Sequence, residues 1–320
     1  MVLLKNYRRK TAREFFSTLS KKLEAYDYNS ALLDIDVLLE ACLKKNRAWI
    51  LSNGEKILNH KDLSKLNAYV SFRKKGKPIA YILNEKEFYG FSFFVDERVL
   101  IPKSDTEILV EKAFEFCSEV LKSKLTQKDF VENAKNEFAI LDLCSGSACI
   151  GIAIVKTLCN KIKTTQNLNK PKIILTLQDI SHSAMQVARI NVERLLKAET
   201  ETGLVKVEYR RSDLRLGLTG NFDCIVANPP YVPTSTSVKL LQDGRSEPLL
   251  ALDGGFDGLE LFPDISSGIA KSLKDGGAFF VEAGEYNIEK AFTILQKQNF
   301  QNLKIHFDLN GMQRVISGKL

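Results

Sequence analysis

The sequence predicts an α/β fold, with a seven-stranded, mostly parallel sheet, an antiparallel last strand and a small helical domain in front. Two observations lead to this prediction. From residue 138 onward, short apolar segments with β propensity alternate with helical segments, which is typical of a doubly wound parallel sheet. Near the C-terminus two such segments flank Asn310-Gly311, a turn that reverses the chain and makes the last pair antiparallel.

The first 85 residues are expected to form a helical bundle. Thr11-Ala-Arg-Glu14 has the pattern of a capping box and predicts a helix that begins there. A second helix is predicted from about Ser30 to Leu43. A third is predicted from about Asp62 to Lys74, where Gly76 and Pro78 follow as C-terminal signals. Domain boundaries are therefore expected at 1–85 for this bundle.

Residues 86–105 are predicted to be a β-hairpin linker. Phenylalanines at 88, 91, 93 and 94 favour strands, and Gly90 supplies a turn. A helix is expected from about Thr106 to Leu121. The polar stretch 122–137 that follows is interpreted as a variable loop or a helix extension. The larger α/β domain would then occupy residues 106–320.

The elements of the α/β domain follow from the alternation. The predicted strands are 139–143, 173–178, 205–210, 222–227, 278–283, 303–307 and 313–317. The predicted helices run from after Gly146 to about 159, and over 183–196, 258–273 and 288–298. A parallel sheet that ends in an antiparallel hairpin is the architecture of class I, Rossmann-like methyltransferases.

The composition excludes several classes. A chain of 320 residues with 44% hydrophobic and 27% charged residues is ordinary for a soluble globular protein. No apolar run approaches the ~18–20 residues that cross a bilayer, and the N-terminus lacks a signal peptide, so we expect a cytoplasmic protein without membrane association. Three histidines far apart and six cysteines without a C-x-x-C pair disfavour a metal site and a histidine-based triad.

The positive charge is concentrated at the N-terminal end. Residues 1–85 hold 17 Lys/Arg and 9 Asp/Glu, whereas the remaining 235 residues hold 29 and 30. Such a basic balance suggests an acidic or nucleic-acid-associated partner. A solvated helical face is an equally acceptable interpretation.

The segment Ile140–Ile150 reads as a strand, a turn of small residues and a helix. The turn Cys144-Ser145-Gly146-Ser147-Ala148 would let a ligand lie against backbone N–H groups at the helix start. Any nucleotide-binding fold has this arrangement, so a dinucleotide and plain packing remain alternatives. Asp142 favours a ligand that carries an ammonium group, as S-adenosylmethionine does.

Carboxylates also end the next two strands. Asp179, at the end of the second strand, can accept both ribose hydroxyls of an adenosine cofactor. The alternative is a helix cap, but Ser181 or Ser183 could serve there and leave Asp179 available. After the third strand, Asp213 is expected near the exocyclic amine of adenine, with Leu214 packed on the ring.

The motif Asn228-Pro229-Pro230-Tyr231 follows the fourth predicted strand and carries the predicted catalysis. Its two prolines fix the backbone and lack N–H donors, so nearby carbonyls remain acceptors. The side-chain oxygen of Asn228 and the carbonyl of Pro229 could receive both hydrogens of a planar NH2 group. Tyr231 would offer an aromatic face to the flat amide or base. Positioning rather than a general base would then supply most of the rate.

The segment 232–248, directly after this motif, is predicted to be a long polar loop that closes over the substrate.

Together these residues resemble the release-factor glutamine methyltransferase family (the PrmC/HemK group). Besides Asn228–Tyr231, the resemblance covers roughly residues 30–320. Its motifs, in order, are Pro78-Ile-Ala-Tyr-Ile82, Glu87-Phe-Tyr-Gly90, Val95–Pro102, Thr106-Glu107, Glu247-Pro248, Ala251–Gly255 with Asp257-Gly-Leu259, and Asp308–Gly311 with Arg314-Val315.

The resemblance implies a protein-(glutamine-N5) methyltransferase that uses S-adenosylmethionine and methylates the glutamine of the Gly-Gly-Gln loop of class 1 peptide chain release factors. It implies that the N-terminal domain helps dock that factor. By the match, residues 144–148, Asp179, Leu214 and Asn228 would touch the cofactor, and Asn228–Tyr231 would hold the substrate glutamine. The family usually has glycine at positions 144 and 148, so the extra β-carbons of Cys144 and Ala148 crowd the backbone approach to the cofactor. Both side chains are small, so the cofactor is expected to be accommodated.

Two other functions are compatible with parts of the sequence. A nucleic-acid adenine-N6 or guanine-N2 methyltransferase shares the Asn-Pro-Pro-Tyr chemistry, but usually carries a substantial basic or aromatic recognition region. A non-catalytic adaptor could keep the fold, although the intact Asn228, Asp179 and Asp142 disfavour it. No stable nucleic-acid partner is expected.

Overall fold

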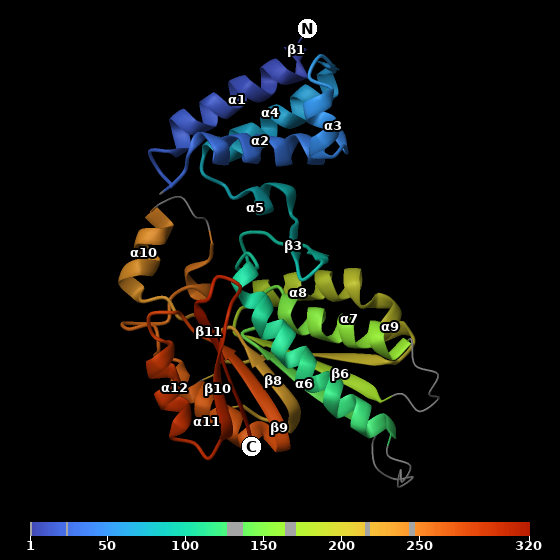
Figure 1. Ribbon diagram of the computed structural model, residues 1–320, viewed down its shortest axis with the longest axis vertical. Coiled ribbons are helices and arrows are strands. Elements are labelled where there is room, and N and C mark those ends of the chain that lie inside the picture. Colours follow the sequence, from blue (N-terminus) through green and yellow to red (C-terminus); the bar gives the residue numbers. More distant parts are fainter. Residues whose placement is uncertain (1, 24, 127–136, 164–170, 215–217, 243–246) are drawn as a thin grey trace. The chain divides into compact units, whose positions relative to one another are not determined.

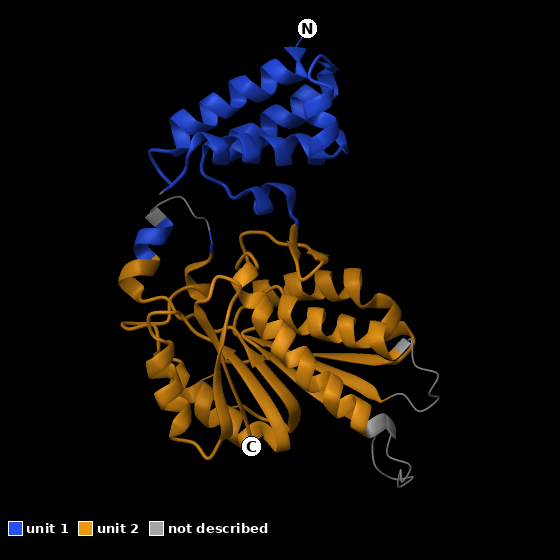
Figure 2. Cartoon of the chain, in the orientation of Figure 1, with its two compact units in different colours: residues 1–85, 238–247 blue, residues 86–237, 248–320 orange. Residues whose placement is uncertain are grey.

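The computed structural model describes residues 1–320 except 1, 24, 127–136, 164–170, 215–217 and 243–246. The chain divides into two compact units, shown in blue and orange in Figure 2. The first comprises Met1–Glu85 with Val238–Glu247, and the second comprises Lys86–Ser237 with Pro248–Leu320. Each unit encloses its own buried apolar side chains.

The first unit is a small helical bundle. Its elements are β1 (Val2–Leu3), α1 (Leu4–Leu19), α2 (Tyr28–Leu43), α3 (Arg47–Ser52), β2 (Ile57–Leu58), α4 (His60–Lys74) and α5 (Ile79–Leu83) (Figure 1). Helices α1, α2 and α4 pack around fully buried side chains such as Phe15, Leu38 and Leu66. The predicted second and third helices are confirmed to within two residues. Asp27 caps α2 by accepting a hydrogen bond from the N–H of Ser30, 2.7 Å away.

The predicted helix start at Thr11–Glu14 is wrong, because α1 begins at Leu4 and runs through these residues. No side chain caps α1. Instead the N–H of Leu4 donates to the carbonyl of Lys56 at 2.8 Å, and the N–H of Lys5 donates to that of Gly54 at 2.9 Å. Contacts about fifty residues along the chain therefore satisfy N–H groups that a cap normally serves. A local capping pattern could not reveal this.

The second unit carries the α/β fold. Its elements are β3 (Lys86–Phe88), β4 (Phe91–Phe93), η1 (Ser104–Thr106), α6 (Glu107–Thr126), β5 (Glu137–Leu143), α7 (Cys149–Lys163), β6 (Lys172–Asp179), α8 (His182–Leu195), α9 (Lys197–Glu201), β7 (Val205–Arg211), β8 (Phe222–Ala227), α10 (Thr234–Gln242), η3 (Leu249–Ala251), α11 (Phe262–Ser272), β9 (Leu273–Glu282), α12 (Ile288–Gln296), β10 (Gln301–Phe307) and β11 (Gln313–Lys319). Helix α10 crosses the boundary between the two units.

One seven-stranded sheet forms the centre of this unit, in the order β10-β11-β9-β8-β5-β6-β7. Strands β7, β6, β5, β8 and β9 pair in parallel, whereas β11 is antiparallel to both β9 and β10. The predicted fold class is confirmed, including the antiparallel last strand. The hairpin of β3 and β4 is also present, and Tyr89 and Gly90 turn it with φ of 51° and 74°.

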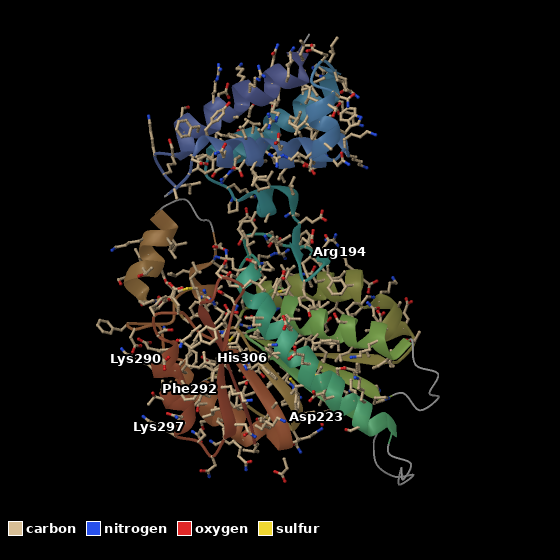
Figure 3. All side chains as sticks on the ribbon, viewed as in Figure 1. Arg194, Asp223, Lys290, Phe292, Lys297 and His306 are labelled. Atoms are coloured by element: carbon tan, nitrogen blue, oxygen red, sulfur yellow. The ribbon has the colours of Figure 1, made fainter. Side chains whose placement is uncertain are left out.

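Helices cover both faces of the sheet (Figure 1). Buried side chains of α6, α7 and α8 pack on one face, and those of α11 and α12 pack on the other. Asp223, labelled in Figure 3, links the start of β8 to the neighbouring strands β5 and β9. Its Oδ2 accepts hydrogen bonds from the N–H of Ala139 at 2.7 Å and from Nζ of Lys274 at 2.6 Å.

All seven predicted strands are present, and β8 has the predicted bounds. Two predictions after β8 are wrong. The segment 232–248 is not one long loop, because α10 occupies Thr234–Gln242; residues 243–246 lie outside the described part. The helix predicted from 258 begins at Phe262, since Gly254, Gly255 and Gly258 form a loop that packs against Pro230 and Tyr231.

The polar stretch 122–137 begins as an extension of α6, which continues to Thr126. Residues 127–136 lie outside the described part of the chain. None of the helices in the described residues combines the length and apolar character that crossing a bilayer requires.

Candidate active site

A cavity of about 550 Å³ lies at the carboxyl ends of the parallel strands of the second unit. This is where open α/β sheets bind ligands. Segments at the ends of four strands contribute its lining: Cys144–Ser147 after β5, Asp179–Ser181 from the last residue of β6, Ser212–Leu214 after β7, and Asn228 with Pro230 after β8. The volume falls within the range of about 300–1,000 Å³ that small-molecule pockets occupy.

Most of the predicted site residues therefore border one cavity. Of the predicted set, Cys144, Ser145, Gly146, Ser147, Asp179, Asp213, Leu214, Asn228 and Pro230 line it. Asp142, Ala148, Pro229 and Tyr231 do not belong to its lining. The roles of all these residues stay predictions. Residues predicted to bind the cofactor and residues predicted to hold the substrate amide nevertheless border the same cavity.

The turn after β5 has an unusual backbone. Cys144, Gly146 and Ala148 have φ of 57°, 51° and 62°, the left-handed region that glycine adopts with least strain. The N–H of Ser145 donates to the carbonyl of Gln178 at 3.0 Å, and that of Ala148 donates back to Ser145 at 2.6 Å. Cys144 and Ala148 thus take conformations for which a β-carbon is unfavourable, and packing must hold them there.

Asn191 forms hydrogen bonds that hold the turn after β5. This side chain of α8 is fully buried, and its Nδ2 donates to the carbonyl oxygens of Ser147 at 2.9 Å and Phe94 at 3.0 Å. Its Oδ1 accepts a hydrogen bond from the N–H of Phe94 at 2.7 Å. Sequence reasoning missed this contact, because an asparagine inside a predicted helix gives no local signal of a distant partner.

Asp142 lies beneath the turn rather than in the cavity wall. It is fully buried, and its Oδ2 accepts a hydrogen bond from the N–H of Gly151 at 2.8 Å, near the start of α7. Its Oδ1 has no hydrogen-bond partner among the described residues. Burial raises the pKa of Asp142 to about 8, against the lowering effect of the Gly151 bond. Asp142 is not part of the cavity lining, and its contact with a ligand ammonium group stays a prediction.

Asp179 joins the ends of two strands. Its Oδ2 accepts from the N–H of Gly146 at 2.8 Å, and its Oδ1 accepts from that of Ser181 at 2.8 Å. Ser181 caps α8 by accepting from the N–H of Ala184 at 3.2 Å, as one of the two predicted caps. Burial raises the pKa of Asp179, whereas the bonds from Ser181 and Gly146 lower it. The carboxylate borders the cavity and also organises it.

Asn228 is held by a residue from a distant element. Its Nδ2 donates to the hydroxyl of Thr106, with 3.2 Å between the atoms. Because the amide nitrogen has this partner, the side-chain oxygen is the atom of Asn228 that remains to accept hydrogen bonds from a ligand.

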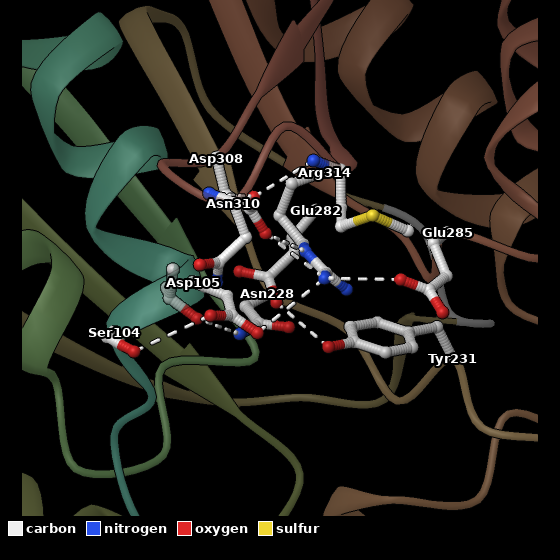
Figure 4. A network of polar contacts seen from close by, with 11 residues as sticks. Ser104, Asp105, Asn228, Tyr231, Glu282, Glu285, Asp308, Asn310 and Arg314 are labelled. Carbon is white, nitrogen blue, oxygen red and sulfur yellow. Dashed lines mark hydrogen bonds and ion pairs between the residues drawn. The ribbon is translucent and has the colours of Figure 1, made fainter.

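The side chain of Tyr231 is held through its hydroxyl group. Its hydroxyl donates to Oε1 of the buried Glu282 at 2.9 Å (Figure 4), and burial and Glu282 raise the pKa of Tyr231. The ring is not part of the cavity lining, and the aromatic face for the substrate stays a prediction.

The backbone of Tyr231 is held from the other side. Its carbonyl oxygen accepts hydrogen bonds from Oη of Tyr286 at 3.0 Å and from Nδ2 of Asn287 at 3.1 Å. Gly258 approaches so closely that an added β-carbon would lie 2.1 Å from this oxygen. The glycines of the loop after η3 therefore allow it to press against the motif.

Thr106 contacts Asn228 and Glu282 contacts Tyr231, and neither residue was predicted to have a role. Thr106 and Arg314 stand in segments that resemble family motifs; Thr106 contacts Asn228, which follows β8, and Arg314 contacts Asp308, which follows β10. Glu282 was detectable only as a carboxylate at the carboxyl end of a parallel strand, the same signal that pointed to Asp179. Arg314 binds Asp308, with 3.2 Å between Nη2 and Oδ2 (Figure 4).

Two family models and several known proteins match this chain. Residues 14–83 match the family described as "PrmC N-terminal domain", and residues 103–243 match "Methyltransferase small domain". A release factor glutamine methyltransferase of Leptospira interrogans is 34% identical over 310 residues, which cover 93% of this chain and 96% of that protein. One of Clostridium acetobutylicum is 32% identical over 288 residues, covering 88% and 89%.

Solved structures show weaker likeness. The hMettl16 catalytic domain, solved with an RNA hairpin, has 14% sequence identity and a TM-score of 0.49, covering 83% of this chain and 84% of that one. At this level the likeness carries no conclusion about activity.

Proposed function

The chain belongs to the release factor glutamine methyltransferase family, and we propose that it methylates the side-chain amide nitrogen (N5) of a glutamine, with S-adenosylmethionine as the methyl donor. The substrate is the glutamine of the Gly-Gly-Gln motif in class 1 peptide chain release factors, and the reaction supports translation termination. One observation carries the proposal. Asn228 opens onto the same cavity as Gly146 and Asp179, so amide-holding and cofactor-holding groups share one space.

The lining of the cavity fits the cofactor. The turn 144–148 offers small side chains and backbone N–H groups, and Asp179 offers carboxylate oxygens suited to hydroxyl groups. We assign Asp179, Leu214, Asn228 and the turn to cofactor binding, with Asp213 near the adenine edge. When bound, S-adenosylmethionine supplies an electrophilic methyl group on a positively charged sulfur.

The chain itself contributes positioning. The Oδ1 of Asn228 and the carbonyl of Pro229 accept the two hydrogens of the substrate amide, which fixes the nitrogen and raises electron density on it. The prolines keep these acceptors in place because their backbones have restricted freedom. The nitrogen gives up one proton to solvent as the product forms, so no buried general base is needed. Holding the reacting atoms in near-attack geometry supplies most of the rate.

The remaining parts of the chain are assigned supporting roles. Residues 1–85, with their basic surplus, dock the release factor, residues 86–105 link the two parts, and residues 106–320 carry catalysis. Because the substrate takes part in translation, the enzyme acts in the cytoplasm. No stable complex with nucleic acid and no membrane association belong to this function.

The test is methyl transfer from radiolabelled S-adenosylmethionine to three purified acceptors: a class 1 release factor, ribosomal RNA and DNA. We expect label in the release factor alone, and Asn228→Ala should reduce it by about 100-fold or more. Calorimetry should show that the wild-type chain binds S-adenosylmethionine. Label in RNA or DNA would favour the exocyclic-amine methyltransferase, and cofactor binding without any transfer would favour an adaptor.

A further inference from the structure

Gln178 carries a buried amide in the strand that leads to Asp179. It lies in β6, is 4% exposed, and belongs to the lining of the cavity. Its Nε2 has no hydrogen-bond partner among the described residues. Burying an NH2 group without an acceptor is costly, so native proteins usually give such a group a partner. An acceptor for this amide is therefore expected from a ligand in the cavity.

The sheet register shows to which face the Gln178 side chain projects. Gln178 pairs with Leu143 of β5, and residues paired in register on neighbouring strands project to the same face of the sheet. Asp179, the next residue, projects to the opposite face, where its carboxylate accepts from the N–H groups of Gly146 and Ser181. The two side chains therefore serve different parts of a ligand. The ribose hydroxyls assigned to Asp179 are not the acceptor for Gln178.

The cavity wall on the Gln178 side of the sheet is apolar. Leu143 and Leu214 belong to one packed cluster, Leu261 packs against it, and all three residues line the cavity. Leu214, which is assigned to cofactor binding, follows β7, the strand that pairs with β6. An aromatic heterocycle fits such a wall, because its faces are apolar and its ring nitrogens accept hydrogen bonds at the edge. The adenine ring of the cofactor has this chemistry.

We propose that Gln178 is a specificity-determining residue for the cofactor, and that its Nε2 donates a hydrogen bond to a ring nitrogen of adenine. The inference rests on the proposed function, since it requires the adenosine of the cofactor to lie in this cavity. Glutamine and asparagine amides recognise adenine in nucleic acids through the same kind of hydrogen bond. A ligand without an acceptor at this point would leave the NH2 group buried and unpaired, so the site discriminates against it.

The experiment measures binding rather than turnover, by calorimetric titration of the full chain with S-adenosylhomocysteine, which keeps the adenosine and lacks the reactive methyl group. Three analogues of this compound each replace one ring nitrogen of adenine, N1, N3 or N7, with a C–H group. Gln178→Met removes the NH2 donor and keeps an unbranched side chain of similar length. Gln178→Leu is a second apolar variant, for the case in which the methionine chain does not fold.

Thr176→Val is the matched control. Thr176 lies two residues before Gln178 in β6, so its side chain projects to the same face of the sheet. It is 1% exposed, and its Oγ1 also has no hydrogen-bond partner among the described residues. Unlike Gln178, it does not belong to the lining of the cavity. The control therefore removes a buried unpaired polar group from the same strand without touching the ligand.

We expect Gln178→Met to weaken the binding of S-adenosylhomocysteine about 10-fold, because the ring nitrogen loses its donor in a buried site. The wild-type chain should lose a similar factor with one of the three analogues. Gln178→Met should bind that analogue no more weakly than it binds S-adenosylhomocysteine, since the contact is already missing. Thr176→Val should bind every ligand as the wild-type chain does.

Unfolding of the ligand-free chain separates a binding role from a structural one. An apolar side chain at position 178 removes a buried donor that has no partner, so Gln178→Met should unfold at the same urea concentration as the wild-type chain or at a higher one. A residue that only supported the fold would lower that concentration when replaced, and such a fall would contradict the assigned role.

Two binding results would overturn the inference. One is unchanged affinity for S-adenosylhomocysteine in a folded Gln178→Met chain. The other is a loss in Gln178→Met that is equally large for the parent compound and for all three analogues, because the amide would then contact no ring nitrogen. If the wild-type chain binds neither S-adenosylhomocysteine nor S-adenosylmethionine, the proposed function fails together with the inference. If the wild-type chain binds both and Gln178→Met binds them equally well, only the role of Gln178 has failed.

Discussion

Asp179 and Gly146 are joined by a hydrogen bond in which the N–H of Gly146 donates to Oδ2 of Asp179, at 2.8 Å. The same carboxylate accepts from Ser181 through Oδ1, and the backbone carbonyl of Asp179 accepts from the N–H of Ser212 at 3.2 Å. One residue thus ties together the segments that follow β5, β6 and β7. Asp179 therefore helps to shape the cavity and also contributes a carboxylate to its lining.

Asp179→Asn tests this double role. Asparagine offers one acceptor oxygen, so its NH2 group must face one of the two N–H donors. We expect S-adenosylmethionine affinity to fall about 10-fold or more, and unfolding free energy to fall by about 1–2 kcal/mol. Calorimetric titration and urea unfolding measure the two effects. Asp223→Asn, in a carboxylate that bonds Ala139 and Lys274 away from the cavity, should lower stability without changing affinity.

Cys144→Gly and Ala148→Gly should each raise stability. The left-handed backbone costs a residue with a β-carbon about 1 kcal/mol or more, which exceeds the entropy that glycine adds to the unfolded chain. We expect each variant to gain a few tenths to about 1 kcal/mol in urea unfolding. Ala153→Gly, inside the helix α7, should instead lose about 1 kcal/mol. If Cys144→Gly and Ala148→Gly lowered the free energy of unfolding as much as Ala153→Gly does, the assigned backbone strain would be contradicted.

Gly258→Ala should disturb the motif through its backbone. An added β-carbon would meet the carbonyl oxygen of Tyr231 at 2.1 Å, so the loop or the motif must move. We expect methyl transfer to fall at least about 10-fold, because small displacements of reacting groups are costly. Gly276 is the matched control, since its φ of 72° resembles the 81° of Gly258 but nothing lies within 4 Å. Gly276→Ala should carry the same backbone strain and keep full activity.

The rate should depend on the ionisation of Glu282. Burial raises the pKa of Glu282 to about 7, while Thr106, Tyr231 and Arg314 lower it and Asp105 raises it. Cys149, on α7, also interacts electrostatically with Glu282. Glu282 accepts the hydroxyl hydrogen of Tyr231, and this hydrogen bond is stronger when the carboxyl group is ionised, so kcat should rise with pH through about 7. Glu282→Gln should remove this rise.

The free energy of unfolding should fall with rising pH, over the range in which kcat rises. The pKa of Glu282 is higher in the folded chain than its ordinary value of 4.5, so folding binds a proton. Its stabilising contribution is complete below pH 4.5 and disappears as pH rises through about 7. Urea unfolding at several pH values should show that the free energy of unfolding declines less with rising pH in Glu282→Gln than in the wild-type chain. An identical decline would contradict the assigned pKa.

The sheet was predictable because its signals are local. Phe222–Ala227 is a short apolar segment between polar turns, and β8 has those bounds. The hairpin β10–β11 followed from Asn310-Gly311. The start of α1 was not predictable, since the carbonyls of Lys56 and Gly54 replace its cap.

The cavity residues were predictable as strand ends, because parallel strands bring their carboxyl ends to one edge. Their detailed contacts were not. Asp142 accepts a hydrogen bond from the N–H of Gly151, and Tyr231 donates one to Glu282. These groups come together only in the folded chain. The hydroxyl of Thr106 lies 122 residues from Asn228 along the chain, and no local pattern encodes that pair.

The central claim is that Asn228 presents a glutamine amide for methylation, and mass spectrometry tests it most directly. A release factor treated with the chain and S-adenosylmethionine should gain a single methyl group, and fragmentation should place it on the side-chain nitrogen of the glutamine in the Gly-Gly-Gln motif. The same treatment with Asn228→Ala should leave that peptide unmodified. A methyl group on any other residue, or on the motif glutamine with the variant as readily as with the wild-type chain, would contradict the account.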